Sequence, residues 1–175
     1  MSTTVAPARR ILLVAQRDDV AVEVTTGLSG SPDVSFLRVA TPQRALAILD
    51  DPEEHGRFAL VIADNDTHPT GGFHLSREAR VRRDMGQETP PVLLVLARPQ
   101  DAWLSDWSQA DAYMVRPIDP FDLAEAAEAL IEARPLPALP GVGGDPVSGP
   151  YDLPGRRREL DSPAQASPAL PGDQP

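Results

Sequence analysis

Polar side chains follow three short apolar runs of the chain, and one of them is a carboxylate. Asp64 follows the run FALVIA, Arg116 follows YMV, and Gln16 follows ILLV and Ala15. If these runs are parallel strands, their carboxyl ends meet at one edge of a sheet, where α/β proteins place their sites. A carboxylate and a guanidinium at one edge attract each other, so the residues alone predict an ion pair between Asp64 and Arg116.

The elements that would position these residues alternate along the chain. Short apolar runs predict strands, and amphipathic segments with capping residues predict helices. Asp19, Thr41 and Asp119 stand where N-caps are expected, and Pro42 favours a helix start. Strands are expected at 11–14, 34–39, 58–63, 92–96 and 113–115, and helices at 19–28, 42–49, 73–85, 102–109 and 120–131. This alternation predicts an α/β fold with a parallel sheet covered on both faces.

Composition excludes several classes of function. The chain has 175 residues and a net charge of −10, and its 16 cationic residues are all arginine. Such an acidic chain lacks the clustered cations of a nucleic-acid-binding surface, so no nucleic-acid partner is expected. The absence of Cys excludes disulfides, thiolate metal sites and cysteine nucleophiles. Because no apolar stretch of roughly 18 residues and no secretion signal are present, we expect a cytoplasmic protein without direct membrane insertion.

A change of composition near residue 134 divides the chain. Ten of its 20 prolines lie between Pro135 and Pro175, with six glycines among them. Such a segment lacks the apolar residues for a core, so we expect it to be extended or disordered. The predicted organisation is a flexible leader at 1–9, a folded domain at 10–133 and a Pro/Gly-rich tail at 134–175.

Four segments of the predicted domain resemble the receiver domain of response regulators, the CheY-like family. They are ILLV, LVIADNDTHPTGG, PPVLLVLA and ADAYMVRPIDPFDL, and they span the whole predicted fold. The resemblance implies a flavodoxin-like, doubly wound, five-stranded parallel sheet. It also makes Asp64 the candidate phosphoacceptor and Gly72 the family's loop glycine.

Several positions depart from the pattern that receiver chemistry needs. Ala15 and Gln16 replace the carboxylate pair that holds Mg²⁺ beside the acceptor, and a neutral amide is a poor Mg²⁺ ligand. Leu96 replaces the Ser or Thr that bonds the phosphoryl group, and Arg116 replaces the Lys. Tyr113 keeps the switch aromatic without its hydroxyl partner. These degenerate positions predict a pseudo-receiver that needs no cofactor.

Two further carboxylates follow the first strand and leave an alternative open. Asp18 and Asp19 are expected to cap the first helix, or else to supply the missing metal ligands. In the second case Mg²⁺ would be the cofactor, and Asp64 would accept a phosphoryl group.

A pair of tryptophans marks a candidate surface. Trp103 and Trp107 are four residues apart and therefore share one face of the helix DAWLSDWSQAD. Alignment on Tyr113 predicts that both point outward, where they would form an apolar patch for a partner. The inward positions of this helix are then Ala102, Ser105, Ser108 and Ala110.

Two other segments are candidate contacts with a partner. Pro69, Gly71 and Gly72 predict a tight turn after Asp64. In the tail, the segment YDLPGRRRELD combines apolar residues with arginines and is typical of a docking motif that orders on binding. The arginines of this segment are Arg156, Arg157 and Arg158.

A narrower resemblance suggests what the partner is. PTGG after Asp64, together with RPQDAWLSDWSQADA, is similar to stand-alone receiver-like proteins of actinobacteria that accompany respiratory complex I. The resemblance implies an accessory subunit without a redox centre, docked on the hydrophilic arm of the proton-pumping NADH:quinone oxidoreductase. That partner would bring the protein to the cytoplasmic face of the inner membrane.

Two functions therefore remain as hypotheses. The first is a non-catalytic pseudo-receiver that acts as a protein–protein interaction module in a large complex, contacting complex I peripheral arm subunits. The second is a single-domain response regulator, phosphorylated on Asp64 by a histidine kinase in a two-component phosphorelay. An enzyme is not expected, because no dinucleotide-binding turn, nucleophile elbow or metal cluster is found in the sequence.

Overall fold

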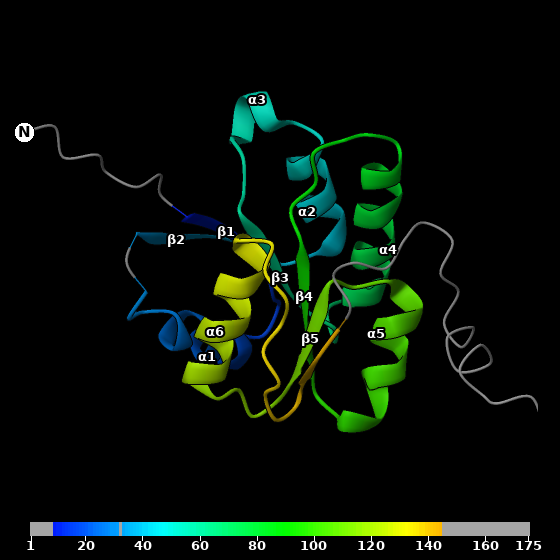
Figure 1. Ribbon diagram of the computed structural model, residues 1–175. Helices are drawn as coiled ribbons and strands as arrows, with labels where there is room; N and C mark the ends of the chain where they lie inside the picture. Colours follow the sequence, from blue (N-terminus) through cyan, green and yellow to red (C-terminus); the bar gives the residue numbers. More distant parts are fainter. Residues whose placement is uncertain (1–8, 32, 145–175) are drawn as a thin grey trace, which may run out of the picture.

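A six-stranded sheet forms the centre of the structure, a computed structural model that describes residues 9–31 and 33–144 (Figure 1). The strand order is β2-β1-β3-β4-β5-β6. Strands β1 to β5 are parallel, and β6 is antiparallel to β5, so the predicted five-stranded parallel sheet is confirmed. The strands are β1 (Arg9–Val14), β2 (Val34–Val39), β3 (Leu60–Asp64), β4 (Val92–Leu96), β5 (Ala112–Val115) and β6 (Val142–Gly143).

Helices cover both faces of this sheet (Figure 1). They are α1 (Asp18–Gly27), α2 (Pro42–Leu49), α3 (Pro52–His55), α4 (Gly71–Asp84), α5 (Ala102–Ser108) and α6 (Pro120–Ile131). Helices α1 and α6 lie on one face, and α2, α4 and α5 lie on the other. The sequence did not predict the short helix α3. Within the described residues, no helix is both long and apolar enough to cross a membrane.

The core consists of two apolar layers, one on each side of the sheet. Along β1, Ile11 and Leu13 pack against α1 and α6, whereas Leu12 and Val14 pack on the opposite side. All four side chains are fully buried. Because both faces are covered, the central strands β3 and β4 are buried apolar runs without alternation, as parallel strands of α/β proteins are.

Helix starts follow the predicted caps at two of three positions. Thr41 and Asp119 accept hydrogen bonds from backbone N–H groups of the first turns of α2 and α6, and Pro42 and Pro120 follow them directly. The prediction for Asp19 was wrong. The N-cap of α1 is Arg17, whose side chain makes no capping bond, and Asp19 lies inside the first turn.

The first residues of the predicted tail pack back on the domain as a strap, which we define as residues 134–144. The Val115 N–H donates to the Gly141 carbonyl at 2.9 Å, and β6 places Gly143 opposite Tyr113. Leu136 packs against the core layer of α1 and α6. The extended chain expected after residue 133 therefore includes a strand that closes the β5 edge of the sheet.

Candidate functional site

Asp64 lies at the carboxyl end of β3 and is almost completely buried, with 3% of its surface exposed. Its Oδ1 accepts the Asp66 N–H at 3.0 Å. Its Oδ2 is buried and has no hydrogen-bond partner. Burial raises the pKa of this carboxyl above its usual value, against the opposing effect of the Asp66 N–H. A buried carboxylate with one free oxygen is a costly group that favours its neutral form.

The Gln16 side chain holds the loop that follows β3. Its Nε2 donates to the His68 carbonyl at 3.0 Å, and its Oε1 accepts the His68 N–H at 3.1 Å. An amide fits this role because it offers a donor and an acceptor side by side. Gln16 therefore ties the end of β1 to the loop beside Asp64 and uses both of its polar atoms in doing so.

Arg116, at the end of β5, is held by α1. Its Nε donates to Glu23 Oε2 at 2.8 Å, and its Nη2 lies 3.2 Å from Asp19 Oδ2. The second oxygen of Glu23 accepts the Ile118 N–H at 2.5 Å. The predicted ion pair between Asp64 and Arg116 is wrong, because Arg116 pairs with these α1 carboxylates.

Glu23 is a site residue that sequence reasoning missed. It lies four residues after Asp19, so the two carboxylates share one face of α1, the face that meets Arg116. That spacing was visible in the sequence. The missing information was that this face turns toward the end of β5.

The two carboxylates that follow β1 form ion pairs with arginines. Asp18 pairs with Arg38 of β2 at 2.8 Å, and Asp19 pairs with Arg17 at 2.6 Å. The hydrogen bond from Arg17 lowers the pKa of Asp19 to about 2, assisted by Arg116. Neither carboxylate caps α1.

The donor groups at the end of β1 do not fit a magnesium ion. Ala15 has no side-chain oxygen, and Gln16 spends its amide on His68. Mg²⁺ prefers carboxylate oxygens in octahedral geometry. Over residues 9–31 and 33–144, no group of three or more acidic or histidine side chains is arranged to hold a metal.

Comparisons with known proteins give relatives and a fold. No protein-family model matches the chain. It is 32% identical over 102 residues to uncharacterized response regulatory proteins from two strains of Mycobacterium tuberculosis, covering 58% of this chain and 71% of each relative. The chain belongs to the response regulator receiver family. The receiver resemblance expected from the sequence is thereby confirmed.

Solved structures agree with this receiver fold. A putative response regulator from Chloroflexus aurantiacus has a TM-score of 0.61 and 21% identity, covering 73% of this chain and 99% of its own. A receiver domain of a histidine kinase from Syntrophus aciditrophicus has a TM-score of 0.60 and 24% identity, covering 72% and 92%. At these identities the likeness shows the fold alone.

Two further receiver positions lack their usual chemistry in this chain. Leu96 is fully buried in the core layer of α2 and α4, so it offers an apolar side chain where receivers carry a hydroxyl. Tyr113 is half-buried, and Gly143 of the strap lies against its ring, where a Cβ would approach Tyr113 Oη to 2.6 Å. The strap, rather than a hydroxyl near Asp64, thus covers the switch aromatic.

The receiver loop after β3 requires its glycines. Gly71 has φ of +74°, and a Cβ there would lie 2.8 Å from the Asn65 carbonyl oxygen. At Gly72 a Cβ would lie 2.9 Å from Leu94 Cδ2. Pro69 and Gly71 line a shallow depression beside Gln16. These loop residues therefore have a structural role, and their predicted contact with a partner stays a prediction.

The predicted outward direction of the two tryptophans is confirmed. Trp103 is 64% exposed and Trp107 is 49% exposed, whereas Ser105 and Ser108 on the opposite side of α5 are buried. Arg77 of α4 stacks over the Trp107 ring at 4.5 Å. Ala110 is also buried and Ala102 is half-buried, as the predicted register requires. Arg156, Arg157 and Arg158 lie outside the described residues.

Proposed function

We propose that this receiver is a pseudo-receiver, a non-catalytic module that acts by binding another protein. The observation that carries the proposal is the Gln16 side chain, which bonds both backbone polar groups of His68 where receivers hold a metal. Without that metal, the charge that develops during phosphoryl transfer lacks its main counterion. The proposal therefore places the function of the domain in its surface.

A second contact supports the same conclusion. In receiver chemistry a cation at the end of β5 approaches the phosphorylated aspartate. Here Glu23 and Asp19 hold Arg116, and Glu23 also bonds the backbone of Ile118. Moving Arg116 toward Asp64 would break these bonds. The contacts of Arg116 in this structure therefore oppose the position that receiver chemistry would require.

The outward face of α5 is the surface we assign to the partner. Trp103 and Trp107 are rigid and apolar, and tryptophan is enriched among the residues that dominate binding energy. Ordinary soluble domains rarely leave two such side chains exposed together. The stacked Arg77 adds a cation at the edge of this face.

We propose complex I as the partner, with the protein docked as an accessory subunit on peripheral arm subunits at the cytoplasmic face of the inner membrane. The support is the resemblance of RPQDAWLSDWSQADA to the actinobacterial proteins described above, and this segment is the one that carries both exposed tryptophans. The protein would contribute no redox centre and would join the enzyme through this face.

Affinity capture from the native host tests the partner. Complex I subunits should copurify with the tagged protein and be lost with the variant Trp103→Ala, Trp107→Ala. Phe121→Ala is the matched control, because Phe121 is an exposed aromatic residue, 67% exposed, on α6. Equal capture by all three proteins would remove the α5 face from the proposal, and capture of a histidine kinase alone would overturn the complex I assignment.

The alternative function is phosphoacceptance by Asp64, which its free, buried Oδ2 favours. Intact-mass measurement after incubation with acetyl phosphate and Mg²⁺ separates the two functions. We expect no mass increase in the wild type. A phosphoryl adduct that disappears in Asp64→Asn would overturn the pseudo-receiver proposal.

A further inference from the structure

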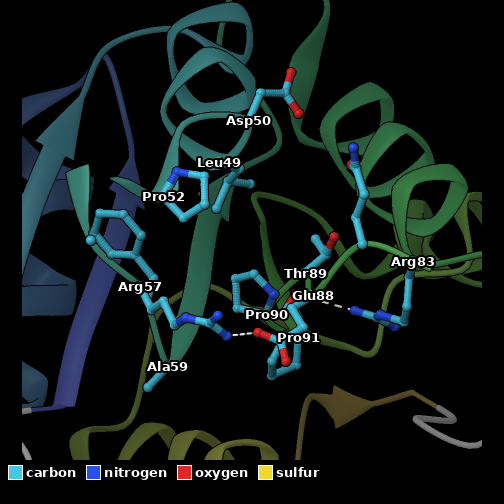
Figure 2. Close-up of a pocket in the computed structure, with 13 residues that line it drawn as sticks. Leu49, Asp50, Pro52, Arg57, Ala59, Arg83, Glu88, Thr89, Pro90 and Pro91 are labelled. Atoms are coloured by element: carbon cyan, nitrogen blue, oxygen red, sulfur yellow. Dashed lines mark hydrogen bonds and ion pairs between the residues drawn. The ribbon is translucent and has the colours of Figure 1, made fainter. Parts of the chain in front are cut away.

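A cavity lies at the end of the sheet opposite to Asp64. It has a volume of about 710 Å³ and is formed where the chain enters β3 and β4 (Figure 2). Its apolar lining comes from Leu49, Pro52, Phe58, Pro90 and Pro91. A cavity of this size and lining is within the range that binds several side chains of a ligand.

The strap ends beside this cavity. Gly144 packs against the backbone at the start of β5. A Cβ on this glycine would be 2.5 Å from the Asp111 carbonyl oxygen. The Asp111 carboxylate in turn bonds both terminal nitrogens of Arg83, at 2.9 and 3.0 Å, and Arg83 lines the cavity. Gly144 therefore lies beside the backbone of Asp111, and the side chains of Asp111 and Arg83 connect that point to the cavity.

The approach of the strap is specified by its glycines. Gly143 packs directly on the Tyr113 ring, and Gly144 has φ of +142° with no room for a side chain. A flexible linker has no need of glycine at particular positions, because its backbone is not held in one conformation. The sequence thus fixes the backbone at residues 143 and 144, the last residues that the structure describes.

Acidic residues stand in and beside α3, whose Pro52 lines the cavity, and we call them the acidic rim. Asp51, Glu53 and Glu54, in and just before α3, are exposed, and the first of these caps that helix. Glu88 lies on the other side and pairs with Arg57, which also lines the cavity (Figure 2). A ligand with apolar residues followed by cations would match both the lining and the rim.

We propose that the occupant of this cavity is segment 151–160 of the same chain, YDLPGRRREL. Tyr151 and Leu153 would enter the cavity, and the three consecutive arginines 156–158 would lie on the acidic rim. Six residues lie between Gly144 and Tyr151, and the seven residue steps from one to the other span up to roughly 24 Å when extended, enough to reach the cavity. Arginines 156–158 are the longest run of cations in a chain with net charge −10.

Because segment 151–160 is attached to the domain, weak contacts are sufficient for it to occupy the cavity. A short linker gives an effective concentration on the order of 1 mM, so an intrinsic dissociation constant of about 0.1 mM would leave the site roughly tenfold more occupied than empty. Hydrogen exchange at the cavity amides, in and around Arg57 and Thr89, should then slow about tenfold relative to a chain ending at residue 144. This proposal is independent of the fate of Asp64 and of the partner of α5.

A spin label tests the contact directly, because the chain has no native cysteine. The full-length variant Gly155→Cys, labelled and otherwise unchanged, should broaden the amide signals of Arg57, Phe58 and Thr89. Reversal of the arginines by Arg156→Glu, Arg157→Glu and Arg158→Glu should abolish the broadening. Combining that reversal with Glu53→Arg and Glu54→Arg should restore it, which separates charge pairing from a change in folding.

Three results would overturn the proposal. One is the absence of broadening at the cavity in the labelled protein, and another is broadening confined to α5. The third is broadening seen only when labelled protein is mixed with isotope-enriched, unlabelled protein, which would assign the cavity to the tail of a second copy.

Discussion

Replacing Glu23 tests whether the contact between α1 and the end of β5 stabilises this receiver. The Glu23 carboxylate accepts hydrogen bonds from Arg116 Nε at 2.8 Å and from the Ile118 N–H at 2.5 Å. It also lies 2.7 Å from Arg116 Nη2. Both side chains of the ion pair are 22% exposed. Glu23→Ala removes these contacts, leaves the Ile118 N–H without its acceptor, and leaves the Arg116 guanidinium with Asp19 as its remaining partner.

The magnitude follows from the kinds of bond that are lost. A hydrogen bond to a charged group contributes roughly 1.5–3 kcal/mol, and partial exposure puts this pair at the low end of that range. Adding the cost of an unpaired Ile118 N–H, we expect Glu23→Ala to lower the free energy of unfolding by about 2–3 kcal/mol. Glu23→Gln keeps an acceptor for that N–H, so we expect about 1 kcal/mol.

Urea unfolding followed by the fluorescence of Trp103 and Trp107 measures both values. A loss of 2–3 kcal/mol also corresponds to a Tm lower by roughly 6–10 °C for a domain of this size. Glu53→Ala is the matched control, because Glu53 is an exposed carboxylate on α3. If Glu23→Ala and Glu53→Ala have equal stability, the contact contributes nothing and the reasoning about Arg116 fails.

Three more predictions concern the region around Asp64. Asp64→Asn should raise the free energy of unfolding at pH 7 by about 1 kcal/mol, because it removes the charge of a buried carboxyl. Burial raises the pKa of Asp64 in the folded state, so the charge penalty develops as the pH rises from the unfolded value near 3.9 through the folded one. The gain of Asp64→Asn should therefore vanish in acid, as urea titrations at several pH values would show. Gly72→Ala should cost roughly 1–3 kcal/mol, since its methyl would lie 2.9 Å from Leu94 Cδ2, and thermal unfolding measures that loss. Ala15→Asp combined with Gln16→Asp should create Mg²⁺ binding that calorimetric titration detects.

Each of these predictions has a result that contradicts it. A stability gain of Asp64→Asn that persists unchanged in acid would show that the Asp64 charge is not its cause. A fully stable Gly72→Ala variant would mean that the loop shifts without cost. Failure of the double aspartate variant to bind Mg²⁺, while folded, would show that more than the two missing carboxylates separates this site from a metal site.

The sequence predicted the elements well where signals are local. The sheet strands appear as apolar runs, and Thr41 and Asp119 cap their helices because an N-cap bond involves only the next turn. Trp103 and Trp107 were placed outward from helical spacing and one alignment, and the buried Ser105 and Ser108 agree.

The site was predicted less well, because its contacts join distant parts of the chain. Gln16 bonds His68 across 52 positions, and Glu23 bonds Arg116 across 93. The sequence shows that position 16 has no carboxylate, but it does not predict that the Gln16 amide bonds His68. An ion pair of Asp64 with Arg116 was expected from their shared sheet edge, whereas the competing α1 carboxylates depended on the rotation of that helix.

The strap also determines where this protein can be shortened safely. A chain cut at residue 133, where the composition changes, would lose β6 and leave the backbone groups of β5 open along the edge of the sheet. Open edges of this kind template pairing between molecules, so such a fragment should aggregate at concentrations where a chain ending at 144 stays monodisperse. We therefore expect these two residues of strand to protect the fold against self-association.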